Sequence, residues 1–345
     1  MAIVLVTGAA GFIGSHVAEC CRQQGFHVVG LDDLSGADGR NVPDGVQFVQ
    51  GSICDAALVS ELFREYAFDY VYHLAAYAAE GLSHFVRRFN YSNNLIGTMN
   101  LVNESARYGV KCFVFTSSIA VYGSAQVPMT EEMTPRPEDP YGIAKYAVEL
   151  DLMAARRVFG LPFVVFRPHN VYGERQNFAD RYRNVVGIFM NQAMTGEPMT
   201  VFGSGLQRRA FSHVDDVAPI IAMAPLVDRA YGEAFNIGAD VSCTVLELAR
   251  IVADTVGVSL QLRHLPPRQE TANVFAGHEK VRRVFGRRAN VTLSEGVARM
   301  AAWARTVGPL AQAPFRELEV VVNVPPSWVA VNDEPNIGAA ETRNE

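Results

Sequence analysis

Short hydrophobic runs alternate with longer amphipathic stretches through the first half of the chain. The runs are rich in β-branched and aromatic residues and show little polar alternation, which is typical of strands covered on both faces of a parallel sheet. We predict strands at 3–7, 27–32, 46–50, 70–74, 112–117 and 162–167. The stretches between them include predicted helices at 13–24, 93–108 and 141–159. This alternation of strand and helix predicts an α/β domain with a doubly wound parallel sheet.

The regular alternation ends near residue 168, after which loops with Gly or Pro separate short predicted helices. We interpret 1–168 as the main domain, to which some later segments return, and 169–331 as a smaller mixed α/β domain that covers a substrate. Residues 332–345 are polar and without periodicity, so we expect a flexible tail. A chain of 345 residues exceeds one typical core, which agrees with two closely packed domains.

Composition narrows the function classes. The net charge is −6, which argues against a general nucleic-acid binder. No apolar run approaches the roughly 20 residues that cross a bilayer, and the chain enters a strand-like run without a signal peptide, so we expect a cytoplasmic protein with no membrane partner. Its five cysteines lack metal-ligand spacing, which predicts reduced structural thiols and no metal site.

A glycine-rich turn joins the first predicted strand to the first helix. Gly8, Gly11 and Gly14 follow the pattern G-x-x-G-x-x-G. They would permit a tight turn, close approach of a pyrophosphate and close helix–strand packing, and the helix N-terminus would bind phosphate. We include Phe12 and Ile13, at the helix start, in this predicted dinucleotide site of Rossmann type.

Asp32 ends the second predicted strand, eighteen residues after Gly14. A carboxylate at this place accepts hydrogen bonds from an adenosine ribose and repels a 2′-phosphate, which favours NAD over NADP. The alternative is an Asp that only begins a turn before Leu34-Ser35-Gly36.

Tyr141 and Lys145 form a Y-x-x-x-K motif near the start of a predicted helix. Residues at i and i+4 share one helix face, and an ammonium favours ionisation of a nearby phenol, so the pair predicts proton-transfer chemistry. A surface Tyr and Lys one turn apart would be the structural alternative. Only three of 30 basic residues are lysines, so Lys145 stands where an arginine would serve a solvated surface. Ser118 follows a predicted strand and would bond a substrate oxygen, although serines there are often turn formers.

These motifs together resemble the extended short-chain dehydrogenase/reductase family, specifically its nucleotide-sugar epimerases acting on UDP-glucose or UDP-glucuronate. The resemblance covers roughly residues 3–300 and also rests on His73-Leu74-Ala75-Ala76, Asn93-Asn94, Ser117-Ser118 and Arg167-Pro168-His169-Asn170-Val171-Tyr172-Gly173. It implies that NAD lies among Gly8, Gly11, Gly14, Asp32, Ile53, Leu74, Ala75, Asn93 and Ser117, with Lys145 on the nicotinamide ribose. It further implies that Ser118 and Tyr141 contact the 4-oxygen of the sugar.

The resemblance also implies a UDP-sugar site. The matching residues are Asn170, Asn184 and Val185 for the diphosphate and sugar, Val201 and Phe202 beside uracil, and Arg209 and Arg268 for the diphosphate. Two positions depart from the family pattern. Ser52 replaces an aspartate near adenine, a contact that is lost or passed to Asp55, and Ala78 replaces a lysine near the cofactor phosphate. A homodimer through the helices at 93–108 and 141–159 is expected by family analogy.

We predict NAD-dependent C4 epimerisation of UDP-glucose and UDP-galactose through a 4-keto sugar. The alternative is a UDP-glucuronate 4-epimerase, in which Arg175, Arg181 or Arg183 would bind the C6 carboxylate and Glu80 would oppose it. A sugar 4,6-dehydratase is disfavoured because Ser117-Ser118, and no Asp-Glu pair, follows Thr116; a decarboxylase is disfavoured on similar grounds. A non-catalytic NAD-binding regulator would not need Tyr141 and Lys145.

Overall fold

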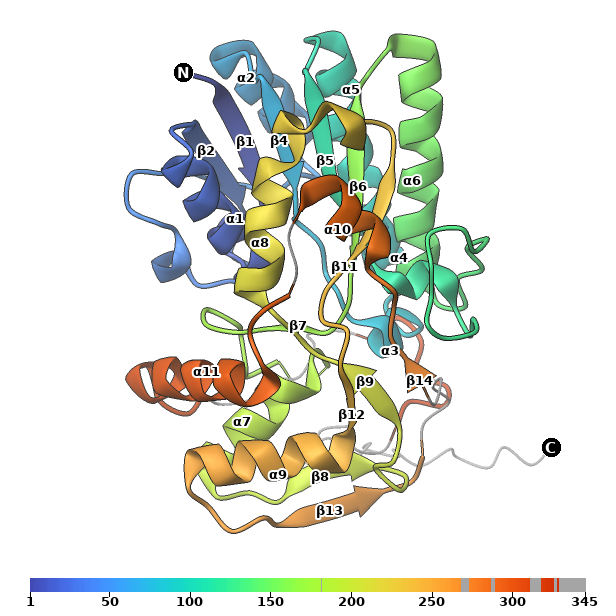
Figure 1. Ribbon diagram of the computed structural model, residues 1–345. Coiled ribbons are helices and arrows are strands. Elements are labelled where there is room, and N and C mark those ends of the chain that lie inside the picture. Colours follow the sequence, from blue (N-terminus) through green and yellow to red (C-terminus); the bar gives the residue numbers. More distant parts are fainter. Residues whose placement is uncertain (181, 268–272, 287–288, 311–317, 326–327, 329–345) are drawn as a thin grey trace, which may run out of the picture.

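The computed structural model describes residues 1–180, 182–267, 273–286, 289–310, 318–325 and 328. Within this part of the chain, seven parallel strands form one sheet in the order β11-β6-β5-β4-β1-β2-β3 (Figure 1). The strands are β1 (Ile3–Thr7), β2 (His27–Asp32), β3 (Gln47–Gln50), β4 (Tyr70–His73), β5 (Cys112–Thr116), β6 (Phe163–Pro168) and β11 (Ala234–Ile237). The predicted Rossmann-type, doubly wound sheet is confirmed.

All six predicted strands are present, with ends displaced by no more than one residue. The seventh strand, β11, was not predicted, because it has only four residues and lies beyond the regular alternation. It pairs with β6, with Ala234 opposite Val165. A segment far along the sequence therefore completes one edge of the sheet.

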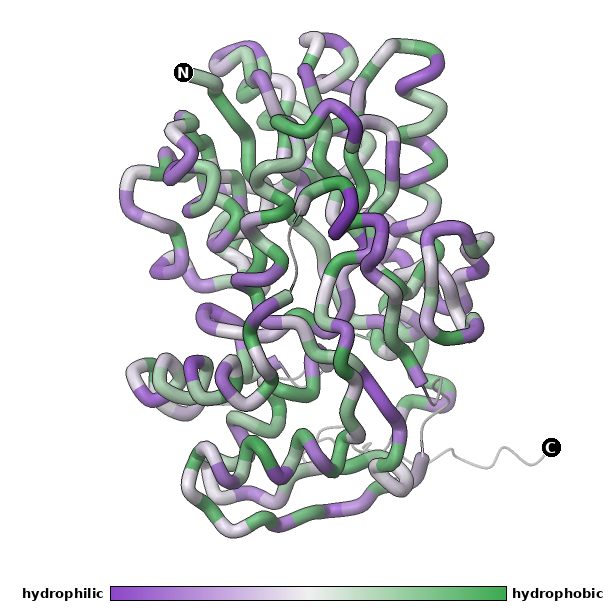
Figure 2. Tube along the Cα trace, viewed as in Figure 1, coloured by the Kyte–Doolittle hydropathy of each residue, from purple (hydrophilic) through white to green (hydrophobic). Residues whose placement is uncertain are grey.

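Neighbouring residues of β1 point into two different cores. Val4 and Val6 pack with α1 (Phe12–Gln23), α8 (Val214–Met223) and α10 (Glu279–Phe285) on one face. Leu5 packs on the other face with α2 (Ala56–Tyr66), α5 (Gly97–Arg107) and α6 (Pro140–Phe159). Burial on both faces explains the unbroken hydrophobic runs, which colour the sheet green in Figure 2.

The helix predicted at 93–108 differs at its start. A π-helical turn at Ser92–Ile96 precedes α5. Gly97 follows this turn, and a Cβ there would lie 2.8 Å from Ile53, so the absence of a side chain lets the helix approach the strand end. At the start of α6 the Asp139 side chain accepts the amide of Gly142 at 2.9 Å, which fixes the N-terminus of that helix.

The second part of the molecule lies beyond the carboxyl ends of the sheet strands (Figure 1). It contains α7 (Val185–Thr195), α9 (Val245–Val256) and α11 (Leu293–Val307), which share one core. Small sheets join β8 (Met199–Phe202) to β13 (Leu262–Leu265), and β9 (Arg208–Ala210) to β12 (Ser242–Thr244) and β14 (Asn273–Val274); another joins β7 (Val171–Tyr172) to β10 (Ser212–His213). The expectation of short helices was wrong, since α11 has 15 residues. The predicted tail at 332–345 lies outside the described residues.

No helix among the described residues is long and apolar enough to cross a membrane. In the same ranges no cluster of His, Cys, Asp and Glu side chains is arranged to hold a metal ion.

Candidate active site

One large cavity of about 2500 Å³ lies between the carboxyl ends of the strands and the second part of the molecule. Pockets for small ligands are about 300–1000 Å³, so this cavity has room for a cofactor and a second ligand together. Its lining includes most of the predicted site residues: Gly8, Gly11, Phe12, Ile13, Gly14, Asp32, Ile53, Leu74, Ala75, Asn93, Ser117, Ser118, Tyr141, Lys145, Asn170, Asn184, Val185, Phe202 and Arg209. Arg268 lies outside the described residues, as does Arg181.

The glycine turn is packed so tightly that side chains cannot enter it. A Cβ on Gly8, which has φ of 71°, would lie 2.8 Å from the Ala75 amide nitrogen, and a Cβ on Gly14 would lie 1.9 Å from the Gly8 carbonyl oxygen. Gly11 is the N-cap of α1 and offers no side-chain cap to the first helical turn. Backbone donors at this helix end can therefore bind a diphosphate.

Asp32 lies at the end of β2, where its carboxylate is nearly buried and borders the cavity. It accepts hydrogen bonds from the amides of Ala10 at 3.1 Å and Leu34 at 2.8 Å. Burial raises the pKa of Asp32, and these two hydrogen bonds oppose the rise. The carboxylate thus joins the glycine turn to the following loop, and each oxygen keeps capacity to accept from a ribose hydroxyl.

Tyr141 and Lys145 face the same side of α6 and line the cavity together. Lys145 is 2 % exposed, which excludes the alternative of a surface pair. Its Nζ donates to the Thr116 carbonyl at 2.8 Å and lies 5.8 Å from the centre of the Tyr141 ring. The two groups of the predicted proton-transfer pair are therefore brought together at the end of β5.

The electrostatics of the pair differ from the expectation that Lys145 favours the phenolate. Burial, with Glu80 as a second cause, raises the pKa of Tyr141, and hydrogen bonding to Ser118 opposes the rise. Burial also lowers the pKa of Lys145 to about 7, against the attraction of Glu149. In the protein alone the phenol is thus a weak acid, because desolvation disfavours both charged forms.

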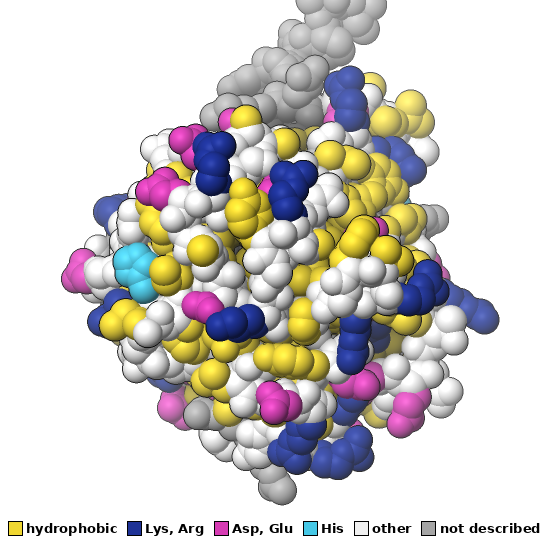
Figure 3. Space-filling model, turned by 90° about the horizontal axis from the view of Figure 1, so that it is seen from above, with side chains coloured by type: hydrophobic (Ala, Val, Ile, Leu, Met, Phe, Trp, Pro, Cys, Tyr) yellow, Lys and Arg dark blue, Asp and Glu magenta, His cyan; other side chains and the backbone are white. Residues whose placement is uncertain are grey.

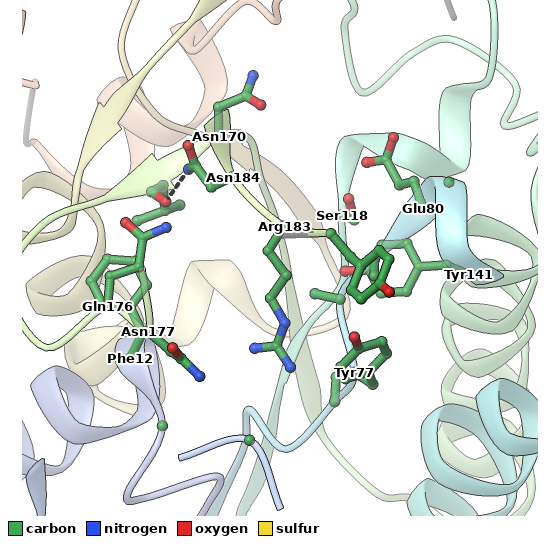
Figure 4. A pocket seen from close by; sticks show the side chains of 18 of the residues that line it. Phe12, Tyr77, Glu80, Ser118, Tyr141, Asn170, Gln176, Asn177, Arg183 and Asn184 are labelled. Atoms are coloured by element: carbon green, nitrogen blue, oxygen red, sulfur yellow. Dashed lines mark hydrogen bonds between the residues drawn. The ribbon is translucent and has the colours of Figure 1, made fainter. Parts of the chain in front are cut away.

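Ser118 stands beside Tyr141, and the two side chains are close together in Figure 4. Its Oγ accepts the Ala120 amide at 3.1 Å, so the serine begins a short helical turn as well as bordering the cavity. The neighbouring Thr116 also lines the cavity, and its buried Oγ1 has no hydrogen-bond partner among the residues that the structure describes. Such a group is costly unless a ligand satisfies it, which indicates that polar atoms bind here.

The substrate-side residues divide into three groups. Phe202 and Val185 border the cavity directly. Asn170 and Asn184 also line it, but their amides already donate to the carbonyls of Ala210 and Val171. Side chains alternate along β8, so Val201 is fully buried in the core while Phe202 turns to the cavity, and a contact of Val201 with uracil would come from its backbone.

Arginine side chains from the second part of the molecule also line the cavity, and we call the part that they line the cationic half. Arg209 lies on β9, and Arg263 lies on β13 and lines the same cavity, although no motif in the sequence pointed to it. Arg183 projects between the two sides of the cavity in Figure 4; it pairs with Asp180 at 2.9 Å and lies over the Tyr77 ring. Arginine forks at these positions suit the oxygens of a diphosphate.

Comparison with known proteins agrees with this geometry. Residues 4–238 match the model of the NAD dependent epimerase/dehydratase family, which is more than half of the chain. The chain belongs to this family. Its relatives include a UDP-glucose 4-epimerase of Mycolicibacterium smegmatis, which is 34% identical over 309 residues that cover 87% of this chain and 98% of the relative.

Solved structures of family members have the same fold. A UDP-glucose 4-epimerase of Thermotoga maritima, determined with UDP-glucose, aligns with a TM-score of 0.83 at 34% identity and covers 88% of this chain and 99% of its own. A UDP-glucuronic acid 4-epimerase of Bacillus cereus, determined with UDP-glucuronic acid and NAD, aligns with a TM-score of 0.81 at 28% identity and covers 88% and 99%. The family also contains dehydratases, so membership alone leaves the reaction open.

The cofactor of the epimerase/dehydratase family is NAD, and the residues of this chain fit it. The side-chain-free turn at Gly8 and Gly14 and the uncapped start of α1 leave space and donors for its diphosphate. Ser52, which departs from the aspartate of the family pattern, lines the cavity. The Asp55 carboxylate caps α2 through one oxygen, Oδ1, which accepts the amides of Ala57 and Leu58 at 3.0 Å.

A buried polar network behind the pair was not foreseen from the family motifs. Glu149, one helical turn beyond Lys145, accepts the Ser117 hydroxyl and the Nε–H and Nη2–H groups of Arg167. Arg167 also donates from Nη1 to the Tyr122 hydroxyl at 2.7 Å. The Ser117 hydroxyl thus gives its proton to Glu149, and its oxygen keeps the capacity to accept a hydrogen bond from a ligand. The spacing of Tyr141, Lys145 and Glu149 at i, i+4 and i+8 was the available signal.

Proposed function

We propose that this enzyme is an NAD-dependent C4 epimerase of UDP-hexoses, interconverting UDP-glucose and UDP-galactose. The observation that carries the proposal is the convergence of Tyr141, Lys145 and Ser118 on one cavity that also contains the glycine turn and the cationic half. A non-catalytic NAD-binding protein would not require the first three side chains. The serines that follow Thr116 supply no carboxylic acid, which disfavours elimination of water by a dehydratase.

In the proposed reaction NAD, held by the glycine turn, Asp32 and Lys145, would supply the acceptor for the hydride from C4 of the sugar and its return to the opposite face. Tyr141 takes the proton of the C4 hydroxyl, directly or through Ser118, and gives it back to the keto oxygen when the hydride returns. Lys145 holds the ribose of the cofactor and, when protonated, favours the Tyr141 phenolate. The reaction is redox-neutral, since the same hydride and the same proton are restored.

The cationic half would hold the UDP part while the sugar turns over. Arg209 and Arg263, which line the cavity, would bind the diphosphate, and Phe202 would offer a flat apolar surface to the uracil ring. Firm binding of the nucleotide with looser contacts to the sugar would let the 4-keto ring present its other face. In this proposal residues 1–168 with β11 serve the cofactor, and residues 169–331 serve the UDP-sugar.

A UDP-glucuronate epimerase is the second candidate, and Arg183 is the observation that favours it. Arg183 borders the cavity beside Tyr141 and could approach a C6 carboxylate. Arg183 forms an ion pair with Asp180, however, and Arg175 forms one with Glu19 at 2.6 Å, so neither arginine is left for a carboxylate of the sugar alone. Glu80 adds a negative charge near Tyr141. These carboxylates favour a neutral hydroxymethyl group at C6.

We also propose a homodimer through α5 and α6. Large apolar side chains lie exposed along one face of α6: Ile143 at 40%, Leu150 at 49% and Met153 at 59%. Ile96 and Tyr108, which flank α5, are exposed as well. In the view from above (Figure 3) hydrophobic side chains gather on the side where Figure 1 places α6. An apolar face of this kind is typical of an interface between subunits.

The test is to incubate the enzyme with NAD and UDP-glucose, and in parallel with UDP-glucuronate, and to follow the C4 epimers by NMR. We expect UDP-galactose to form and the Tyr141→Phe variant, with unchanged circular dichroism, to lose nearly all turnover. Near-normal turnover of that variant would refute the role of Tyr141. Activity on UDP-glucuronate alone would select the second candidate, and a 4-keto-6-deoxy product would show a dehydratase.

A further inference from the structure

The described residues 318–325 and 328 follow α11 and lie outside the family match, which covers residues 4–238. The relatives above are covered over 98–99% of their own length by 87–88% of this chain, so this chain has residues beyond those that align. Contacts that 318–325 and 328 make in the cavity are therefore contacts from outside the family match.

This C-terminal segment is fastened to α4 (Arg87–Tyr91) by backbone and side-chain bonds. The amides of Glu319 and Val320 donate to the Phe85 carbonyl at 2.8 and 3.1 Å. The Glu319 carboxylate accepts the amides of Arg88 at 2.7 Å and Phe89 at 2.8 Å. The N-cap of α4, Val86, makes no side-chain bond of its own, so Glu319 supplies the missing cap from another part of the chain.

Trp328 packs against α3 (Glu80–Ser83). Its ring is 6 % exposed and meets the rings of Phe85 and Tyr182 edge-on, with centroids 5.9 and 5.1 Å apart. The indole lies over Gly81, where an added Cβ would be 3.3 Å away. The remaining exposed part of Trp328 lines the cavity, as do Asn323 and Pro325 of the same segment.

The part of the cavity next to Trp328 is the end that contains the reacting group. Glu80, at the start of α3, acts on the charge of Tyr141, and the Ser83 Oγ accepts the Tyr141 amide at 3.3 Å. Asn90 on α4 donates to the carbonyl of Pro140, directly before Tyr141, at 2.9 Å. Both helices that the segment covers therefore also contact the start of the helix that carries Tyr141.

Resting on the function proposed above, we propose that Trp328, with Asn323 and Pro325, forms a wall of the sugar subsite. Trp328 presents its indole to the sugar ring, and Glu319 is the positioning residue that holds the segment in place. An aromatic surface packs against the C–H groups of a pyranose ring. In this proposal the wall acts on the sugar and not on the uridine diphosphate, which Arg209 and Arg263 would bind.

The test compares affinities for UDP and UDP-glucose by calorimetry, with saturating NAD and full-length protein. The Tyr141→Phe background keeps a single sugar in solution. We expect Trp328→Ala to weaken UDP-glucose about tenfold, which corresponds to about 1.4 kcal/mol, while UDP affinity stays the same. Trp328→Phe should lose less, and Glu319→Ala should show the same selectivity for the sugar. Val321→Ala, in the same segment and 73% exposed, is the matched control and should bind both ligands normally.

The proposal that Trp328 is a wall of the sugar subsite would be overturned if Trp328→Ala weakened the binding of UDP and UDP-glucose equally, or weakened neither. Circular dichroism and thermal unfolding of each variant distinguish the loss of a contact with the sugar from unfolding of the protein. If the Trp328→Ala variant does not fold, the conservative Trp328→Phe variant, which retains an aromatic ring for packing, takes its place. The proposed epimerisation is judged independently, because it fails if the wild-type enzyme interconverts no UDP-sugar. If the wild-type enzyme is active and Trp328→Ala leaves the affinity for UDP-glucose unchanged, the proposed role of Trp328 is refuted and the proposed epimerisation is not.

Discussion

Replacing Gly14 with alanine tests how the cofactor turn is built. Alanine is favoured over glycine inside a helix by about 1 kcal/mol, so propensity alone predicts a more stable protein. The added Cβ would however lie 1.9 Å from the Gly8 carbonyl oxygen, where real Cβ contacts are not found below 3.0 Å. The turn or the helix must therefore move by more than 1 Å, and forced overpacking of this kind costs about 1–3 kcal/mol or more.

We expect Gly14→Ala to lower the melting temperature by a few degrees, as about 1–2 kcal/mol of net destabilisation implies. The same displacement moves the backbone donors at the start of α1, so NAD affinity should fall at least about tenfold. Differential scanning fluorimetry with and without NAD, and calorimetric titration of NAD, measure both effects. Gln23→Ala, at the exposed end of the same helix, is the control. A Gly14→Ala protein that is more stable and binds NAD normally would refute the packing argument.

Three further predictions concern other parts of the molecule. Arg209→Ala should weaken UDP at least about tenfold, since a hydrogen bond to a charged group contributes about 1.5–3 kcal/mol, without changing NAD affinity; Arg283→Ala, exposed on α10, should change neither titration. The folded-state pKa of Lys145 is lowered from 10.5 to about 7, so between those values the unfolded chain binds more protons than the folded one. Stability without NAD should thus rise with pH from 7 toward 10 relative to Lys145→Met, and urea denaturation that shows the same pH slope in both proteins would contradict this. Met153→Glu should shift the enzyme toward monomer in light scattering, whereas Leu226→Glu, equally exposed elsewhere, should not.

Much of the sheet and cofactor turn could be predicted because the signals are local. A run such as Ile3–Thr7, followed by three spaced glycines, specifies a strand, a turn and a helix within twenty residues. The four residues of β11 carry no comparable signal, and their place beside β6 depends on packing between distant segments. Val201 and Phe202 were expected from the family pattern alone, which does not tell which of the two β8 residues faces the cavity and which faces the core.

The residues of the proton-transfer pair could be predicted from the sequence, but the burial and the pKa values of the two groups could not. The i, i+4 spacing correctly indicated that Tyr141 and Lys145 share a face, because helix geometry determines it. Their pKa values depend on burial and on Glu80, which comes from a different element, so spacing alone suggested the wrong direction for Tyr141. Arg263 and Trp328 lie in segments that become neighbours of the cavity only when the chain folds.

The composition of the core beside α1 has a consequence for how the protein is made. That core joins Val4, Val6 and Val17 to Val217, Phe235 and Phe285, which emerge from the ribosome much later. A nascent chain that ends near residue 168 would leave this face of the sheet open to water, with β6 as an unpaired edge. Residues 1–168 therefore cannot complete their core until the later segments have been synthesised. A recombinant fragment comprising residues 1–168 should aggregate instead of binding NAD.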